Sequence, residues 1–500
     1  MTADTSAYER FDSPLASRYA GEEMSRIFSS AQKFRTWRRL WLALAEAEKE
    51  LGLPITDEQL RQMRQHLDDI NFERAEALER ELRHDIMAHV HAFGEQCPAA
   101  KPIIHLGATS CDIADNADLV AMRDGLALLG RRLMTIADRL ATFAAEHRAL
   151  ATLGFTHYQP AQLVTVGKRA CLWLWDIVAD LEAVDYMRMN LWMRGIKGTT
   201  GTQASFLRLF DDDHKKVARL EQLVAEKMGF DNVQPVTGQT YSRKVDAQVM
   251  AVLSGIAQSA HKFANDLRLL AGRKEMEEPF EKSQIGSSAM AYKRNPMRSE
   301  RMTGLARVLI NLEPAAAATA AEQWLERTLD DSAARRIFLG EGFLAADAIL
   351  RLYQNIAEGI VVYPKVIASH VAAELPFMAT ENILMAAVTA GGDRQQLHEA
   401  IRRHSQEAAR CVKIEGGEND LLARLKADPL FAKVDIEAEL DPRRFVGRAP
   451  EQVDEFLENY IQPLLEANRD LIGTEANIEV LVVLLRNLTP CAVGLPTHRA

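Results

Sequence analysis

Apolar side chains recur at alternating steps of three and four over long stretches of this 500-residue chain. One run comprises Leu126, Leu129, Leu133, Ile136, Leu140 and Phe143, and a second comprises Val249, Leu253, Ile256, Ala260, Phe263, Leu267 and Leu270. This spacing places each set on one face of an α-helix. The second run lies in a stretch without proline from Val236 to Glu278, so one helix can extend through most of it. Long helices with apolar faces need partners, either within the chain or from other copies of it.

Strand-like alternation and Asn-Gly hairpin signals are scarce in the sequence, so we predict an all-α fold with a bundle of long helices at its centre. We expect three helical domains: an N-terminal domain over 1–109, the central bundle over 110–363 and a C-terminal domain over 364–500. The alanine run 315–318 is typical of a helix whose small side chains allow close packing. The apolar runs therefore indicate architecture rather than chemistry.

Charge and cysteine usage argue against several classes of protein. Seventy acidic residues against 60 basic ones give a formal charge of −10, which provides no general attraction to nucleic acid or anionic lipid. The five cysteines are far apart and form no Cys-x-x-Cys pair, so neither a disulfide framework nor a zinc site is expected. No leader-like segment or membrane-length apolar run is evident. We expect a cytoplasmic protein with no nucleic-acid or membrane partner.

The polar segment GSSAMAYKRNP, residues 286–296, interrupts the helical pattern. A glycine and two serines followed by Lys293 and Asn295 indicate a loop that carries hydroxyls, a cation and an amide close together. Such a loop can close over a carboxylate. Taken alone, the segment is equally typical of a serine-rich turn with solvated cations.

This segment is similar to the signature of the fumarase/aspartase superfamily, and its Ala-Met-x-Tyr-Lys-Arg-Asn form resembles the adenylosuccinate lyase branch. One departure is Ala291, where family members usually carry proline. Further segments resemble the same branch, particularly its eukaryotic-type form, and follow in the expected order. They are SPLASRYA (13–20), RHDIMAHVHAFG (83–94), HLGATSCDIADN (105–116), FTHYQPAQ (155–162), GTTGTQASF (198–206), TGQTYSRKVD (237–246), LDDSAARR (329–336) and MATENILMAAVTAGGDR (378–394).

The resemblance implies β-elimination of fumarate from adenylosuccinate, giving AMP, and from succinylaminoimidazole carboxamide ribotide, giving AICAR, in purine nucleotide biosynthesis. It implies no cofactor, small-molecule substrates, and a homotetramer in which segments of different subunits form each active site around a central multi-helix core.

Elimination needs a base that removes a proton next to a carboxylate and an acid that protonates the departing nitrogen. By resemblance, Ser287 is the base, activated by nearby positive charge from Lys293. His157 is the acid, since imidazole titrates near neutrality. His84 is a further catalytic candidate that supports His157 or the succinyl group. Taken alone, His157 would more often be a structural histidine.

The resemblance also implies a set of substrate contacts. These are Arg18, Tyr19, Arg83, His84, Asp85, Thr109, Ser110, Thr156, Gln239, Lys293, Asn295, Arg301, Arg327, Ser332 and Arg336. The chain has no Gly-x4-Gly-Lys-Ser/Thr loop, so side chains must hold a nucleotide phosphate. Ser332 and Arg336 are four residues apart and share one helix face. Thr109 and Ser110 also suit a helix N-cap.

Two further local patterns have ordinary structural interpretations. His84, His89 and His91 lack the i, i+4 spacing of a zinc-binding helix, so we expect no metal and treat His89 and His91 as structural. Arg335 is predicted to be a surface partner of Asp331 at i, i+4.

Two other hypotheses remain open. Another lyase of the superfamily, such as argininosuccinate lyase, acts on a substrate without phosphate. A non-catalytic helical scaffold would keep the fold but would have no need of Ser287, His157, Lys293 and Asn295, all of which are present.

Overall fold

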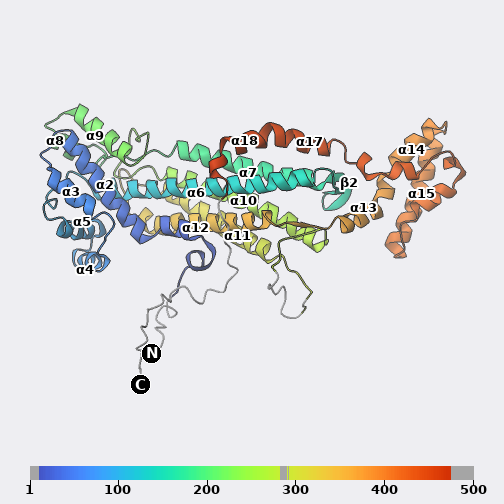
Figure 1. Ribbon diagram of the computed structural model, residues 1–500, viewed down its shortest axis with the longest axis horizontal. Coiled ribbons are helices and arrows are strands. Elements are labelled where there is room, and N and C mark those ends of the chain that lie inside the picture. The colour runs from blue at the N-terminus through green and yellow to red at the C-terminus, as the bar shows by residue number, and fades with distance from the viewer. Residues whose placement is uncertain (1–10, 282–289, 291, 474–500) are drawn as a thin grey trace, which may run out of the picture.

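The computed structural model describes residues 11–281, 290 and 292–473. The molecule is elongated, and its long helices run along its length (Figure 1). The central bundle consists of α6 (Ser110–Glu146), α7 (Val166–Met189), α10 (Lys244–Gly272), α11 (Met297–Ala321) and α12 (Asp330–Ala357). Both apolar runs are confirmed as helix faces, because they lie in α6 and α10 and are buried. The alanine run lies in α11, as predicted.

Shorter helices gather at one end of the bundle (Figure 1). They are α2 (Ser30–Glu50), α3 (Asp57–Gln65), α4 (Phe72–Leu82), α5 (Asp85–Gln96), α8 (Ala204–Leu209) and α9 (His214–Lys227). The first two short helices, η2 (Leu15–Tyr19) and α1 (Glu22–Ile27), lie instead beside the middle of the bundle, where the backbone N–H of Gly21 donates to Asp347 of α12. Although α9 follows α7 in sequence, it packs against α2, where the Lys227 ammonium lies 2.6 Å from Glu50 Oε1.

Beyond the opposite end, α13 (Pro364–Met378) leads to a second hydrophobic core (Figure 1). That core is formed by α14 (Thr380–Thr389), α15 (Arg394–Ile414), α16 (Leu421–Ala427) and the 3-10 helix η3 (Pro429–Phe431). Two further 3-10 helices follow, η4 (Glu437–Leu440) and η5 (Pro442–Arg444). The chain then returns along the bundle through α17 (Ala449–Phe456), η6 (Leu457–Ile461), α18 (Gln462–Ala467) and η7 (Arg469–Leu471).

In the described part of the chain, no single helix is long and apolar enough to cross a membrane. Only α13 and α14 taken together, bent by 48° at their junction, have the necessary length and composition.

Two small antiparallel sheets interrupt the helical architecture. β1 (Ala151–Thr156) pairs with β2 (Gln159–Thr165), and β3 (Met276–Glu277) pairs with β4 (Val361–Val362). The first hairpin turns through His157 and Tyr158, whose φ angles of 54° and 57° are both left-handed. Two-residue turns of this type usually carry Asn or Gly. Because this turn has neither residue, the hairpin was absent from the sequence-based prediction.

A buried acid lies near the C-terminal end of α2. Neither carboxyl oxygen of Glu48 has a hydrogen-bond partner among the described residues. Burial raises the pKa of Glu48 to about 9. The carboxyl group is therefore protonated and uncharged at neutral pH.

We expect Glu48→Gln to stabilise the protein increasingly as the pH rises. Wild type loses stability from the usual pKa of 4.5 up to about 9, because the unfolded state releases a proton that the folded state retains. Glutamine has no such proton. Thermal unfolding should show the variant's advantage widening between about pH 5 and about pH 8.5. Glu50→Gln, at an exposed position of the same helix, is the control, and a pH-independent difference for Glu48→Gln would contradict the interpretation.

Candidate active site

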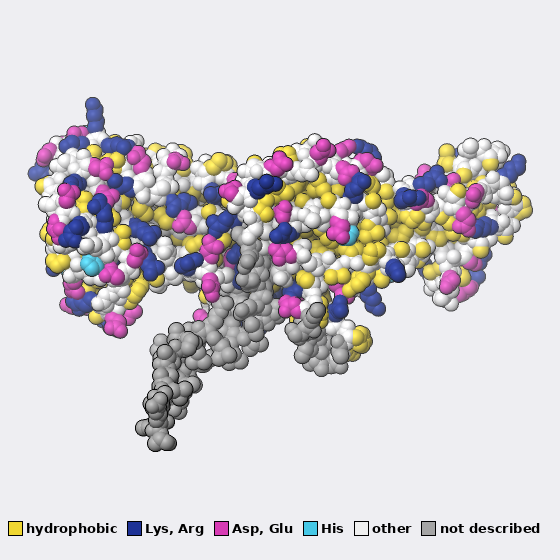
Figure 2. Space-filling model, viewed as in Figure 1, with side chains coloured by type: hydrophobic (Ala, Val, Ile, Leu, Met, Phe, Trp, Pro, Cys, Tyr) yellow, Lys and Arg dark blue, Asp and Glu magenta, His cyan; other side chains and the backbone are white. Residues whose placement is uncertain are grey.

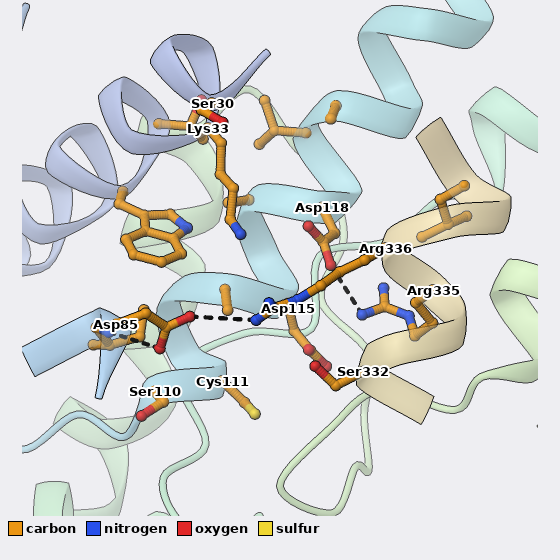
Figure 3. Close-up of a pocket in the computed structure, with 18 of the residues that line it drawn as sticks. Ser30, Lys33, Asp85, Ser110, Cys111, Asp115, Asp118, Ser332, Arg335 and Arg336 are labelled. Carbon is orange, nitrogen blue, oxygen red and sulfur yellow. Dashed lines mark hydrogen bonds and ion pairs between the residues drawn. The ribbon is translucent and has the colours of Figure 1, made fainter. Parts of the chain in front are cut away.

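A cavity of about 880 Å³ opens at the end of the bundle where α2, α5, α6 and α12 meet. In Figure 3, side chains from α2, α5, α6 and α12 point into it. Nine of the predicted substrate contacts line this cavity: Arg83, His84, Asp85, Thr109, Ser110, Gln239, Arg327, Ser332 and Arg336. The fold therefore brings together residues from four of the motif segments.

Helix N-termini present the polar groups on one side of the cavity. Thr109 is the N-cap of α6, as predicted, and its backbone N–H donates to Asp112 Oδ2 at 2.8 Å. His84 is the N-cap of α5, where its Nδ1 accepts from the N–H of Met87 at 3.3 Å. The neutral ring then carries its proton on Nε2, which lies 3.5 Å from the hydroxyl of Ser110. His84 thus links α5 to the first residue of α6.

Asp112 holds three motif segments together behind this surface. Its fully buried carboxylate pairs with Arg194 and accepts from the backbone N–H of Lys197 at 2.8 Å and of Gly198 at 3.1 Å. Arg194 in turn donates to the carbonyl oxygens of Gly198 and Gly238. These bonds tie residues 198–206 and 237–246 to the start of α6.

Close backbone packing between these segments requires a glycine. Gly201 has a φ of 80°, and a Cβ there would lie 1.9 Å from the carbonyl oxygen of Thr237. Only glycine fits this position without moving the backbone.

Beneath the cavity, Arg243 joins three elements through buried ion pairs. Its guanidinium donates two hydrogen bonds to Asp115 of α6, both at 3.0 Å, and one to Asp331 of α12 at 2.6 Å. Burial alone would raise the pKa of Asp115, but Arg243 and then Arg335 offset this and leave the pKa below its usual value. Asp331 also accepts from Arg327 at 2.8 Å, so the predicted ligand Arg327 is held by the same network.

The prediction for Arg335 is wrong. Its side chain is buried rather than at the surface, and it pairs with Asp118 at 2.9 Å and Asp246 at 2.7 Å while donating to the hydroxyl of Tyr241 at 2.6 Å. Asp331 pairs instead with Arg243 and Arg327. The i, i+4 argument failed because the first turns of α12 pack against α6 and α10, where these side chains face buried partners.

Arg336, the next residue of α12, points into the cavity (Figure 3). Its side chain is 67% exposed, and its guanidinium lies 3.6 Å from Asp85 Oδ2. Ser332 lies one turn earlier on the same helix. Arg336 is thus an accessible cation in a site whose other α12 arginine, Arg335, is buried.

Three predicted ligands lie together elsewhere, between η2 and α11. The guanidinium groups of Arg18 and Arg301 lie 5.9 Å and 5.7 Å from the ring centroid of Tyr19. The carbonyl oxygen of Tyr19 accepts from Arg351 at 2.9 Å, which fixes η2 against α12. None of these three ligands lines the cavity described above.

Lys293 and Asn295 lie just before α11 and also outside the cavity. Ser287 and Ala291 lie outside the described residues. Ion pairs and hydrogen bonds join the described residues that precede and follow this segment. Arg298 pairs with Glu281 at 2.7 Å, and the buried carboxylate of Glu278 accepts from the backbone N–H of Arg298 and of Ser299.

Thr156 and His157 lie at the exposed tip of the β1–β2 hairpin. This hairpin follows the C-terminal end of α6, whereas Thr109 and Ser110 lie at its N-terminal end. A helix of 37 residues is about 55 Å long. Within one chain, His157 is therefore far from the cavity. In Figure 1, strand β2 of this hairpin and the helices α2 and α5 lie toward opposite ends of α6.

His89 has the structural position expected for it. Its ring stacks on Phe34 with centroids 3.8 Å apart, and burial, followed by the charge of Arg38, lowers the pKa of His89 to about 4. In the described portion of the chain, no group of three or more His, Cys, Asp or Glu side chains is arranged to hold a metal ion.

Sequence reasoning missed Asp115, Asp118 and Arg243, which form the floor of the site. Asp115 and Arg243 belong to the motif segments 105–116 and 237–246, so charged residues inside those segments were the available signal. Lys33 of α2 was also missed, and nothing in its neighbourhood distinguishes it from a surface lysine.

The chain matches two models of known protein families. A lyase family model matches residues 19–310, and a model of the adenylosuccinate lyase C-terminus matches residues 376–456. Adenylosuccinate lyase from Saccharomyces cerevisiae is 54% identical, over 94% of this chain and 98% of the yeast protein. The chain belongs to the adenylosuccinate lyase family. The Schizosaccharomyces pombe enzyme is 51% identical over 95% of this chain and 99% of its own length.

The adenylosuccinate lyase of the archaeon Pyrococcus abyssi is 31% identical over 90% of this chain and 98% of its own length. The higher identity to the two fungal enzymes agrees with the predicted eukaryotic-type form.

Solved structures share the fold. A 3-carboxy-cis,cis-muconate lactonizing enzyme from Pseudomonas putida superposes with a TM-score of 0.77 at 23% identity, covering 90% of this chain and 99% of that one. A fumarate lyase from Mesorhizobium sp. BNC1 gives 0.75 at 24% identity, covering 88% and 98%. The all-α prediction is confirmed for this member of the adenylosuccinate lyase family.

We expect Arg243→Met to destabilise the protein by about 3–5 kcal/mol, because Asp115 and Asp331 would lose a buried partner. Thermal and urea unfolding measure the loss. Arg402→Met, which removes an exposed pair with Glu399, is the matched control and should cost about 0–1 kcal/mol.

Adding Asp115→Asn to Arg243→Met should recover part of the stability, since one uncompensated carboxylate is then removed. Equal, small losses for Arg243→Met and Arg402→Met would contradict a central role for the network.

Proposed function

We propose that this member of the adenylosuccinate lyase family eliminates fumarate from adenylosuccinate, giving AMP, and from succinylaminoimidazole carboxamide ribotide, giving AICAR. The observation that carries the proposal is the cavity between α5, α6 and α12, where nine predicted substrate contacts meet. Relatives that align over nearly their whole length are named adenylosuccinate lyases.

The donors of the cavity suit the two anionic ends of such a substrate. Thr109, Ser110 and Gln239 offer hydroxyl and amide groups for the carboxylates of the succinyl moiety. Ser332 and Arg336 lie in the first two turns of α12, where backbone N–H groups and the helix dipole also favour an anion. We assign the nucleotide phosphate to this side.

In the proposed reaction, Ser287 removes the proton from the carbon next to a succinyl carboxylate, and the resulting negative charge spreads onto that carboxylate. The positive charge of Lys293 stabilises both the ionised hydroxyl of the base and the negative charge on the succinyl carboxylate. The carbon–nitrogen bond then breaks as His157 gives its proton to the departing nitrogen. Fumarate and the nucleotide amine are the products, and no cofactor takes part.

We propose that a homotetramer assembles this site, with His157 supplied by a different subunit from the one that supplies the cavity. The length of α6, about 55 Å, keeps the two apart within one chain. Apolar side chains are also exposed along the bundle (Figure 2), including Leu172, Tyr186 and Met189 of α7 and Ile337 of α12. Such surfaces favour association between copies.

We propose the cytoplasm as the compartment. The four cysteines within the described residues, Cys97, Cys111, Cys171 and Cys411, are free thiols, which suits a reducing environment.

We expect purified wild-type protein to release fumarate from adenylosuccinate, and Ser287→Ala and His157→Ala each to lower kcat by about 100-fold or more, because each removes an acid–base group. Absorbance at the wavelengths of substrate and product follows the reaction. His214→Ala and Ser369→Ala, at exposed positions away from the cavity, are controls. A folded, tetrameric wild type without turnover would contradict the proposal.

Intersubunit sharing predicts complementation. His157→Ala and Arg336→Ala subunits, each inactive alone, should recover about one quarter of wild-type activity when mixed in equal amounts and reassembled, because a fraction of the shared sites then carries neither substitution. Fumarate release from the mixture measures the recovery. No recovery in hybrids whose tetrameric assembly is verified would show that both residues act within one chain.

A further inference from the structure

The arginines that are ion-paired beneath the cavity cannot supply net positive charge to a ligand. Arg243, Arg327 and Arg335 are paired with four carboxylates, those of Asp115, Asp118, Asp246 and Asp331. Three cations against four anions leave no excess positive charge on the floor of the site. A phosphate monoester carries about 1.5 to 2 negative charges at neutral pH, so it needs cations from outside this network.

Lys33 is such a cation. It extends from the first turn of α2 into the cavity, toward Asp118 and Arg336 and away from Ser110 (Figure 3). Its ammonium forms no ion pair with any described residue, and lies 5.0 Å from the ring centroid of Trp37 and 5.7 Å from that of Phe34. Cation–π contacts hold the side chain in place without cancelling its charge.

Trp37, one turn further along α2, lines the same cavity. It is 1% exposed, and its Nε1–H has no acceptor among the described residues. A buried donor without an acceptor is costly, and an oxygen of a bound ligand would remove that cost. Two unmatched donors, an ammonium and an indole N–H, therefore stand on the same wall of the cavity.

We propose that Lys33 is a further substrate-binding residue that, with Trp37 and opposite Arg336 of α12, binds the phosphate of the nucleotide. This inference rests on the proposed function and extends its phosphate site from α12 to α2. The position of Lys33 decides between the anionic groups of the substrate. The hydroxyl and amide donors for carboxylates lie at the start of α6, whereas Lys33 lies on the side of Asp118 and Arg336 (Figure 3).

The test compares Lys33→Met and Lys33→Arg with Lys49→Met, a matched control at the other end of the same helix and outside the cavity. Titration calorimetry of the intact enzyme measures the affinities for AMP and adenosine, and inhibition assays measure the effect of fumarate. We expect Lys33→Met to weaken AMP binding by about tenfold or more, since a charge-assisted bond is lost. Adenosine and fumarate affinities should change by less than about twofold.

Further readouts separate binding from structural damage. Lys33→Arg should recover much of the AMP affinity because it keeps the charge, and Lys33→Met should raise KM for adenylosuccinate more than it lowers kcat. Thermal unfolding midpoints of Lys33→Met and Lys33→Arg should match that of wild type, since the Lys33 ammonium forms no ion pair with a described residue. The midpoint of Lys49→Met should fall slightly, because this variant loses an ion pair with Asp57.

Unchanged AMP affinity in Lys33→Met would overturn the proposal. Weaker fumarate inhibition with normal AMP binding would overturn it too, by assigning Lys33 to a carboxylate. If wild type binds AMP but does not cleave adenylosuccinate, the proposed function fails, while the calorimetric comparison still decides whether Lys33 binds phosphate.

Discussion

The bidentate pairing of Arg243 with Asp115 is the interaction on which the rest of the site depends. Together with the bond to Asp331, it joins α6, the start of α10 and α12 at one buried point. Burying these charges costs free energy that the pairing offsets only when the geometry is good and the remaining donors are satisfied. The network therefore favours one arrangement of the three helices, and that arrangement sets the shape of the cavity above it.

The same network divides the arginines of the site into two kinds. Arg243 and Arg335 are buried, paired and structural, whereas Arg336 is exposed and points into the cavity. Arg335 and Arg336 are consecutive in α12 but face different surroundings, because a step of one residue turns a side chain by about 100° around the helix axis. Of these three arginines, only Arg336 is accessible to a ligand in the cavity.

Helix length imposes a second constraint. α6 carries the polar N-terminus of the cavity at one end and leads into the β1–β2 hairpin at the other. His157 sits at the tip of that hairpin with a left-handed backbone, a conformation that non-glycine residues adopt at a cost. A long, straight helix cannot fold back to bring these ends together. The architecture thus separates groups that the proposed reaction uses together, and the proposed tetramer is a means of bringing them into one site.

Local sequence determined a great deal about this protein. The repeats around Leu133 and Val249 predicted the long helices, because helical periodicity depends only on neighbouring residues. The motif segments predicted a set of substrate contacts, nine of which line one cavity, and Thr109 was correctly expected to cap a helix. Tertiary structure decided features that the spacing of neighbouring residues does not specify. It buried Arg335 against α6 and α10, set His157 far from Ser110, formed a hairpin without a glycine turn, and brought Lys33 into the cavity. Each of these outcomes depends on the length, direction and packing of helices distant in sequence, so no window of adjacent residues holds the information.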